Sequence, residues 1–304
     1  MAFNVTILGC SSALPTSKRN PTAQVLNVFE RFFLIDCGEG TQIQLRKFKF
    51  KLSRINHIFI SHLHGDHYFG LFGLLSSYAL MGRKNDIHIY ADAQIEEIIN
   101  FVLKNIIDNV DFKVIVHELN NKSPEIIYED SHITIKSFPL KHRINTCGFL
   151  FAEKPKTRNI KKEIISEYKL SIKDIISIKD GNDYISELNE IIPNSHLTIA
   201  APAPLSYAYC SDTMFKEENA SYFPNVNLLF HESTFLDIHA DRANDTYHST
   251  AKQAAQTAKI ANANKLILGH YSARYKDLTP ILEEAQEIFQ NTVLGLDGLT
   301  VEIE

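Results

Sequence analysis

Ser61-His62-Leu63-His64-Gly65-Asp66-His67 places four potential metal ligands within six residues. The apolar run 55–60 before this motif predicts a buried strand, and the apolar run 68–75 after it predicts the start of a helix. The ligands are therefore expected in a tight strand-to-helix loop at the edge of a sheet. Imidazole nitrogen and carboxylate oxygen are zinc ligands, so the motif predicts a metal site. A histidine-rich surface loop without metal is the alternative.

Within this motif, the spacing of His62 and His64 lets two imidazoles reach one ion. Asp66 and His67 would then point towards a second ion. The His-x-His-x-Asp-His pattern resembles that of the metallo-β-lactamase fold superfamily. The remaining ligands of such a site are therefore expected elsewhere in the chain.

The composition limits the class of protein. The 304 residues are 44% hydrophobic and 22% charged, which is typical of a soluble globular protein. No apolar run approaches the roughly 20 residues of a membrane helix, and residues 1–9 predict a strand rather than a signal peptide. Four scattered cysteines predict reduced thiols in a cytoplasmic protein. Because the net charge is −5, any contact with nucleic acid would need a local basic patch.

Further ligand-type side chains directly follow strand-like runs. They are Asp36, His142, Asp212, Glu232 and His270. Strand ends at one edge of a sheet converge in space, so these groups and the histidine motif are expected to share a cleft. Asp36 is expected to orient a metal-binding histidine, with a helix cap as the alternative.

Seven of these residues suit a centre with two metal ions. The predicted ligands of the first ion are His62, His64 and His142. The predicted ligands of the second are Asp66, His67 and His270. Asp212 can bridge both, because each carboxylate oxygen can bind a separate ion. Two ions roughly 4 Å apart form a clamp for a displacement at phosphorus or carbonyl.

The order and spacing of the motifs resemble the ribonuclease Z family over nearly the whole chain. The segments that carry the resemblance are 33–42, 61–67, 211–213, 231–234, 248–250 and 269–275. The resemblance implies an α/β (α+β) fold, a four-layer αββα metallo-β-lactamase sandwich, with two zinc ions per subunit. It also implies a homodimer that cleaves precursor tRNA after the discriminator base, leaving a 3′-hydroxyl on the tRNA and a 5′-phosphate on the trailer. Ser211 departs from the family, in which glycine commonly precedes the bridging Asp.

Residues 153–196 differ in character from the rest of the predicted single domain, 1–304. Eight Lys or Arg lie between 154 and 179, and five acids lie between 153 and 180, which leaves an excess of three positive charges. The resemblance implies that this segment is a protruding arm that grips RNA, although it lacks the Gly-Pro-rich tip expected there. The candidate RNA contacts are Lys154, Lys156, Arg158, Lys161 and Lys162. A solvated surface insertion is the alternative.

Three residues are candidates for proton transfer. Asp66 can bind metal and also accept a proton. His248, just before a predicted helix, is the candidate acid for the leaving group, and Glu232 could keep it charged, since a helix N-terminus disfavours imidazolium. A neighbour of a helix cap without a chemical role is the alternative for His248.

Two other functions remain open from the sequence. A hydrolase of the same fold could act on a small phosphodiester, a sulfate ester or a lactone, and would not need the basic arm or the 248–250 motif. A non-catalytic nucleic-acid-binding protein is the third hypothesis. The presence of every candidate ligand argues against it.

Overall fold

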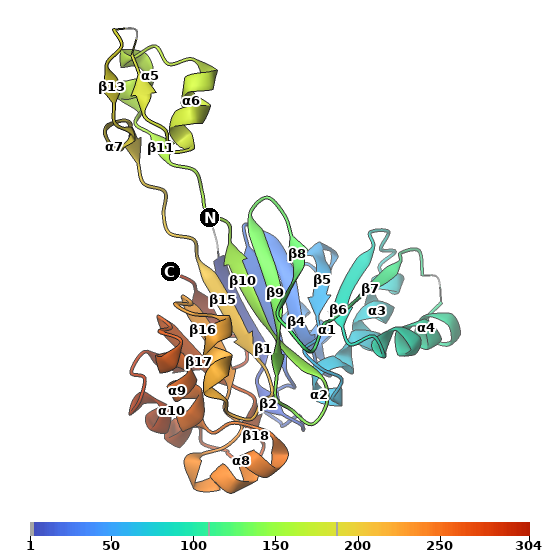
Figure 1. The fold of residues 1–304 in the computed structure, drawn as a ribbon. Coiled ribbons are helices and arrows are strands. Elements are labelled where there is room, and N and C mark those ends of the chain that lie inside the picture. Colours follow the sequence, from blue (N-terminus) through green and yellow to red (C-terminus); the bar gives the residue numbers. More distant parts are fainter. Residues whose placement is uncertain (1–2, 109, 187) are drawn as a thin grey trace. The chain divides into compact units, whose positions relative to one another are not determined.

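The structure is a computed structural model that describes residues 3–108, 110–186 and 188–304. The chain divides into two compact units. The larger unit comprises Met1–Asp130, Thr134–Phe151 and Leu205–Glu304, and the smaller comprises Ser131–Ile133 and Ala152–Pro204. Figure 1 shows the elements of both units in chain order.

The first of two large sheets in the described part of the chain has the order β20-β1-β3-β4-β5-β6-β7. Its strands are β1 (Phe3–Gly9), β3 (Ala23–Val28), β4 (Arg31–Cys37), β5 (Ile55–Phe59), β6 (Ile87–Ala91), β7 (Val114–Glu118) and β20 (Thr300–Glu302). The pairs from β4 to β7 are parallel, whereas β1 pairs antiparallel with β20 and β3. The parallel strands therefore end at one common edge.

The second sheet has the order β19-β17-β16-β15-β10-β9-β8. Its strands are β8 (Glu125–Glu129), β9 (Ile133–Leu140), β10 (Thr146–Glu153), β15 (Ser206–Cys210), β16 (Leu228–Glu232), β17 (Lys265–Gly269) and β19 (Thr292–Leu294). The pairs from β15 to β19 are parallel, so they too end at one edge. The short strands β2 (Ser11–Ser12) and β18 (Tyr271–Ser272) pair beside that edge, where the loops after β1 and β17 meet.

Aromatic side chains fill the space between the two sheets. The ring centroid of Phe59 on β5 lies 5.6 Å from that of Phe149 and 5.4 Å from that of Phe151, both on β10. Phe33 on β4 also contacts Phe151, at 5.9 Å. These rings are fully buried. Each sheet is covered on both of its faces, so its strands carry apolar side chains on both faces.

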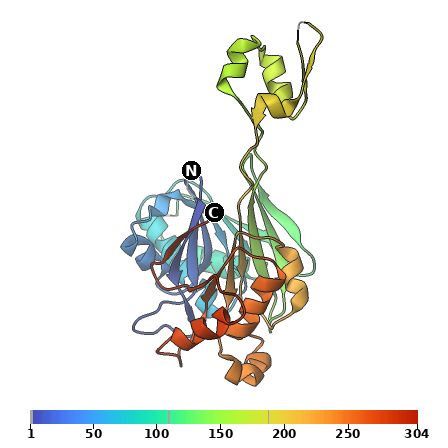
Figure 2. The same cartoon turned by 90° about the vertical axis from the view of Figure 1, so that its left-hand side faces the viewer.

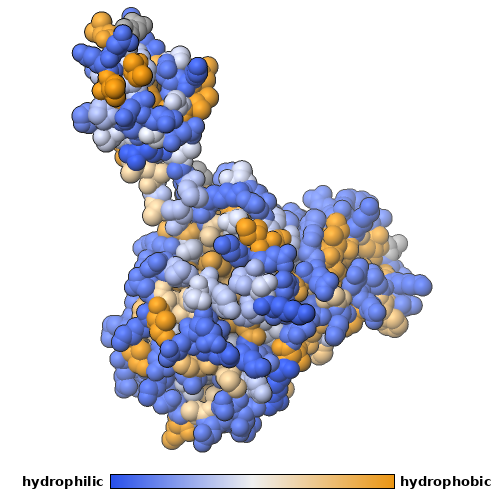
Figure 3. Space-filling model, viewed as in Figure 1, coloured by the Kyte–Doolittle hydropathy of each residue, from blue (hydrophilic) through white to orange (hydrophobic). Residues whose placement is uncertain are grey.

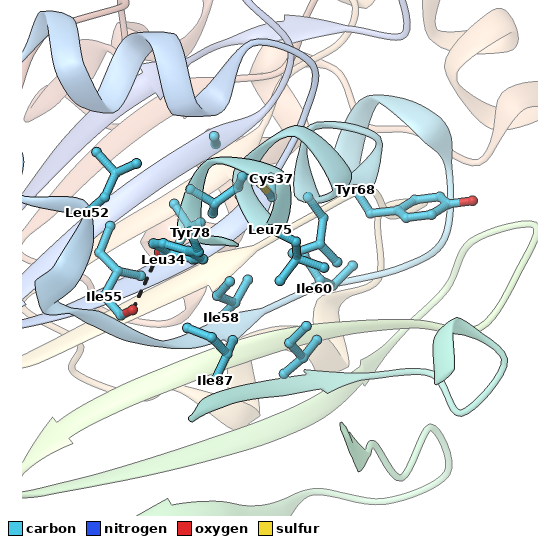
Figure 4. Packing of buried hydrophobic residues seen from close by; sticks show 14 of the residues in the cluster. Leu34, Cys37, Leu52, Ile55, Ile58, Ile60, Tyr68, Leu75, Tyr78 and Ile87 are labelled. Atoms are coloured by element: carbon cyan, nitrogen blue, oxygen red, sulfur yellow. Dashed lines mark hydrogen bonds between the residues drawn. The ribbon is translucent and has the colours of Figure 1, made fainter. Parts of the chain in front are cut away.

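Helices cover the outer faces. On the first sheet these are α1 (Thr41–Lys47), η1 (Leu52–Arg54), α2 (Gly65–Tyr68), α3 (Gly70–Leu80) and α4 (Ile95–Asn105). Figure 4 shows Leu75 and Tyr78 of α3 packed on Leu34, Ile58 and Ile87 of the sheet. The second sheet carries η2 (Glu217–Tyr222), α9 (Ala251–Ile260) and α10 (Thr279–Gln286), whereas η3 (Asp237–His239) and α8 (Ala240–Thr246) belong to the connection between β16 and α9. Figure 2 shows the helices of this second set, orange to red, against their sheet. The larger unit is thus the predicted αββα sandwich.

The smaller unit has its own secondary structure and core. Its elements are β11 (Asn159–Ile160), α5 (Lys162–Glu167), α6 (Ile172–Lys179), β12 (Tyr184–Ile185), β13 (Ile191–Ile192), α7 (Asn194–Leu197) and β14 (Thr198–Ile199). Leu170, Ile178 and Leu197 form a buried cluster. Ser171 caps α6 through a capping box with Asp174. Figure 3 shows apolar and hydrophilic side chains mixed over the surface of this unit.

Some predicted boundaries were wrong around the functional residues. Asp66 and His67 lie in the first turn of α2 rather than in a loop, because the helix begins directly at Gly65. β15 ends at Cys210, so Asp212 lies two residues beyond the strand, and Glu232 is the last residue of β16. β8 was not predicted, because its outward-facing residues are charged and its first two positions are exposed.

Candidate metal centre

The predicted ligands lie together beyond the carboxyl ends of parallel strands of both sheets and of β9, which pairs antiparallel with β8. His62 follows β5, His142 follows β9, Asp212 follows β15 and His270 follows β17. A cavity of about 400 Å³ opens over these strand ends, and its lining includes His64, Asp66, His142, Asp212 and His270. The convergence expected from the sequence is therefore what the fold produces.

The first group of ligand atoms is formed by three imidazoles and one carboxylate. His64 Nδ1 lies 3.0 Å from His62 Nε2 and 3.2 Å from His142 Nε2. Asp212 Oδ2 lies 3.5 Å from His62 Nε2 and 3.9 Å from His142 Nε2. The four atoms surround one point, as ligands of a single ion do.

The second group consists of Asp66, His67 and His270. The two Nε2 atoms of His67 and His270 are 3.3 Å apart. Asp66 Oδ2 lies 3.6 Å from the first and 3.4 Å from the second. Asp212 approaches this group as well, since its Oδ1 is 3.3 Å from His270 Nε2 and its Oδ2 is 3.5 Å from His67 Nε2. Asp212 thus faces both groups.

The donor set fits a divalent cation. Among the described residues, Asp212 Oδ1 is buried and takes part in no hydrogen bond, which is unfavourable for a carboxylate oxygen unless a cation contacts it. Burial lowers the pKa of His62, His64 and His142, so these imidazoles are neutral and carry lone pairs for a metal. Their nitrogens lie 3.0–3.2 Å apart, close enough for one cation to contact all three.

The pKa of His67 also indicates that a cation binds between these groups. Burial lowers its pKa, but the neighbouring carboxylates, first Asp212, outweigh burial and raise the pKa well above its ordinary value. A divalent ion between these groups would take the place of the proton on Nε2. The chain therefore carries a divalent metal site.

Asp36 orients one of the ligands. Its fully buried carboxylate accepts hydrogen bonds from His67 Nδ1 at 2.8 Å, Ser61 N at 2.7 Å, Ser61 Oγ at 2.9 Å and Tyr209 Oη at 2.5 Å. The bond to Nδ1 turns His67 Nε2 towards the ligand group. Asp36 is not the cap of α1, whose N-cap is Gly40. Of the two roles considered for Asp36, the geometry matches the orienting one.

Two other ligands are held in the same way. His142 Nδ1 donates to the carbonyl oxygen of Tyr247 at 2.8 Å, and His270 Nδ1 pairs with Thr234 Oγ1 at 2.9 Å. Tyr247 and His270 both have positive φ values, 59° and 58°. For residues other than glycine this conformation costs about 1–3 kcal/mol, which the surrounding contacts must offset.

His248 forms a pair with Glu232 beside the ligands. Its Nδ1 lies 2.9 Å from Glu232 Oε1, and the imidazole lines the cavity. Burial lowers the pKa of His248, but the Glu232 carboxylate outweighs burial and raises it to about 9. Glu232 is held in turn by Thr234 and by the backbone N–H of Ser249. The Glu232 carboxylate thus favours the protonated form of His248.

Comparisons with known proteins match this geometry. The chain is 45% identical to ribonuclease Z of Bacteroides fragilis and 41% identical to ribonuclease Z of Porphyromonas gingivalis, over 99% of both chains in each case. The solved structure of human tRNase Z, short form, superposes with a TM-score of 0.73 at 27% identity over 99% of both chains. The metallo-β-lactamase fold protein YhfI of Bacillus subtilis shares the fold, with a TM-score of 0.69 at 18% identity over 99% of this chain and 100% of that one.

The chain belongs to the ribonuclease Z family. Residues 3–160 also match the family model described as anti-Pycsar protein Apyc1, so over that segment the chain is a member of this family too. The predicted fold, the ribonuclease Z resemblance and the assignment as an endonuclease-type hydrolase are confirmed. None of the helices in the described ranges has the length and apolar run needed to cross a membrane.

Ser211 shows how this member of the ribonuclease Z family accommodates its departure from glycine. Its side chain is buried, and its Oγ donates to Ser61 Oγ at 2.9 Å. Ser61 Oγ donates in turn to Asp36. The extra hydroxyl therefore joins the network that holds His67. Neither this network nor the role of Thr234 was predicted, because Ser and Thr carry no spacing signal of their own.

The predicted RNA contacts of this ribonuclease Z relative all lie in the smaller unit. Lys156 Nζ lies 3.2 Å from Glu153 Oε2. Arg158 Nε donates to Thr198 Oγ1 at 2.7 Å, and Lys161 Nζ donates to the carbonyl oxygen of His196 at 2.7 Å. Lys162 is exposed and Lys154 is half-buried. Of the five, Lys156 and Lys162 are exposed, and Lys156 is paired with the buried Glu153 carboxylate.

Proposed function

We propose that this chain cuts the 3′ trailer from precursor tRNA, leaving a 3′-hydroxyl on the tRNA and a 5′-phosphate on the trailer. The observation that carries the proposal is that seven side chains able to bind metal and the His248–Glu232 pair lie together at one site. The full-length similarity to ribonuclease Z gives the substrate class.

We propose two zinc ions per chain as the cofactor. His62, His64 and His142 would hold one, and Asp66, His67 and His270 the other. Asp212 would bridge, since its two oxygens face both groups. Bound zinc supplies a Lewis acid and a water of lowered pKa at neutral pH. The mixed nitrogen and oxygen donor set supports zinc over magnesium, which prefers oxygen ligands.

The protein groups are arranged to move protons at both ends of the reaction. The Asp66 carboxylate accepts the backbone N–H of Ala13 at 2.7 Å. Burial raises its pKa, but His67 and His270 outweigh burial and hold the pKa far below its ordinary value. It is therefore ionised and positioned to accept the proton of the attacking water. His248 then donates its proton to the 3′ oxygen of the tRNA as the bond from that oxygen to phosphorus breaks.

The smaller unit would grip the RNA. Over residues 152–204, eight basic and eight acidic residues balance, so the positive excess is confined to 154–179. We infer that this basic half contacts the RNA backbone through Lys154, Lys156, Arg158, Lys161 and Lys162, which positions a substrate without reading its sequence. A homodimer, in which the unit of one subunit serves the centre of the other, completes the proposal. All four cysteines are free and buried, which is consistent with a cytoplasmic location.

The deciding experiment is incubation of the purified chain with a precursor tRNA that carries a 3′ trailer, with and without chelator. We expect one cut, a 3′-hydroxyl on the tRNA and loss of cutting with chelator. Hydrolysis of a small chromogenic phosphodiester is measured in parallel. Hydrolysis of that compound with no cutting of the precursor would favour the small-substrate hydrolase instead.

A further inference from the structure

Phe69 is a large apolar side chain left 49% exposed at the cavity over the metal ligands. Nearby lining residues such as Glu39, Arg143 and Thr246 are polar. A single exposed apolar residue needs no explanation by itself. Phe69, however, lines the same cavity as the predicted metal ligands, and its ring packs against their motif. Its exposure therefore needs an explanation.

The ring is fixed directly against the ligand motif. A β-carbon placed on Gly65 would lie 2.4 Å from Phe69 Cε2 and 2.8 Å from Cζ, so the ring can occupy this position because residue 65 is glycine. Gly65 stands between the ligands His64 and Asp66. The backbone N–H of Phe69 donates to the Gly65 carbonyl at 2.9 Å, and the Tyr68 ring packs edge-on at 4.9 Å. The ring therefore packs against the motif, and about half of the side chain stays exposed at the cavity.

We propose that Phe69 is the stacking platform for the base of a nucleotide next to the scissile phosphate. This inference rests on the proposed function. A phosphate held over the ligands has its neighbouring base only one sugar away, and Phe69 lies within the same few residues as those ligands. Unpaired RNA bases stack on aromatic side chains.

A phenylalanine ring suits a substrate whose sequence varies at the cut. It offers no hydrogen-bonding group, so it reads no base edge, and every base has a face that can stack on it. The other wall supplies charge, because Arg143 lines the same cavity and is held by its bond to the Asp245 carbonyl at 2.9 Å. An apolar face and a cation in one cavity match the two parts of a nucleotide, its base and its phosphate.

The test combines a protein variant with a missing base. Three precursor tRNAs are compared: intact, abasic just before the cut and abasic just after it. We expect Phe69→Ala to lower kcat/KM on the intact precursor by about 10-fold, chiefly through KM. On one abasic precursor the same substitution should cost nothing further, because the stacked base is already gone. Phe69→Tyr should keep the wild-type rate, and Phe69→Leu should not.

A matched control is Phe101→Ala on α4, since Phe101 is 61% exposed but does not line the cavity. It should cut all three precursors like the wild type. An equal loss for Phe69→Ala on the intact and both abasic precursors, or no loss at all, would overturn the proposal. If Phe69→Ala loses metal, the comparison of Phe69→Leu with Phe69→Tyr decides in its place. If the proposed function itself is wrong, the wild type will leave all three precursors uncut. That result is distinct from a failure of the stacking proposal.

Discussion

At the scale of single residues, His248 carries the most specific chemical expectation. We predict that His248→Ala lowers single-turnover cleavage by roughly 100-fold or more, as the loss of a positioned acid does. His248 also forms, with Asp212 and His270, a third group of side chains that could hold a metal ion. Because the seven predicted ligands do not include His248, we expect the metal content to stay the same. Rapid-quench kinetics and metal analysis of the same preparation check both statements. Unchanged single-turnover cleavage would remove His248 from the mechanism.

The effect of the Glu232 carboxylate on His248 leads to a second prediction, which concerns the pH dependence of cleavage. Because it raises the pKa of His248 to about 9, the acid form persists through neutral pH and is lost as pH rises above that value. Cleavage should therefore fall on the alkaline side near pH 9. In Glu232→Gln the charge is gone, and the alkaline limb should move down by about one to two pH units. A limb that stays in place would show that Glu232 does not tune His248.

Asp36 stabilises the metal centre through its hydrogen bond to His67. Asp36→Ala would leave the buried donors of Ser61, His67 and Tyr209 without their acceptor. We predict about 3 kcal/mol of lost stability and about 10- to 100-fold weaker metal affinity. Denaturant unfolding and competition with a chelator measure the two effects. Tyr209→Phe removes one of the same bonds and should show a smaller loss of stability, with metal affinity nearly unchanged.

At the scale of elements, the sequence predicted what periodicity and ligand spacing encode. The parallel strands β4, β5, β6, β15, β16 and β17 were predicted because buried strands appear as continuous apolar runs. The proximity of the seven predicted ligands followed, since strand ends converge. The orienting contacts of Ser61, Ser211 and Thr234 could not be predicted, because they depend on which loops meet in space. The fold of residues 152–204 was also missed, since its strands are only two residues long.

A further prediction concerns the effect of the smaller unit on cleavage of precursor tRNA. Its core uses Leu170, Ile178 and Leu197, so residues 154–203 should be replaced together by a short Gly/Ser linker. We predict much weaker cleavage of precursor tRNA, mainly through poorer binding, with hydrolysis of a small phosphodiester retained. Separately, the double variant Lys156→Ala and Lys162→Ala should flatten the salt dependence of RNA binding.

The control for the lysine variant is Lys104→Ala on α4, outside this unit. It should bind RNA with the slope of the wild type. If the linker variant folds, keeps its metal and cuts precursor tRNA at full efficiency, the unit is a surface insertion. The small-substrate hydrolase would then be the better interpretation.

At the scale of the whole molecule, a histidine array away from the metal centre predicts sensitivity to acid. The rings of His57, His88 and His117 stack across β5, β6 and β7, at 5.0 Å and 5.2 Å. Burial first, and then the neighbouring histidines, lower the pKa of His57 to about 4. The unfolded chain binds this proton near pH 6.5. Stability should therefore fall as pH drops from about 6.5 towards 4.

His57→Phe keeps a ring in the stack and removes the titrating group. Between pH 7 and 4.5 we expect the wild type to lose about 1–2 kcal/mol more stability than this variant, after allowance for partial exposure. Denaturant unfolding at the two pH values measures the difference. Equal losses in both proteins would show that the array does not govern acid stability.

In the whole molecule, strand ends from both sheets would together build the centre for two metal ions. Its most direct test is the metal content of purified, fully active wild-type protein and of Asp212→Ala. We predict two divalent ions, zinc, per chain in the wild type. Asp212→Ala should have a lower content and no activity, because it removes the carboxylate that faces both groups. Full activity with no more than one ion per chain would contradict the account.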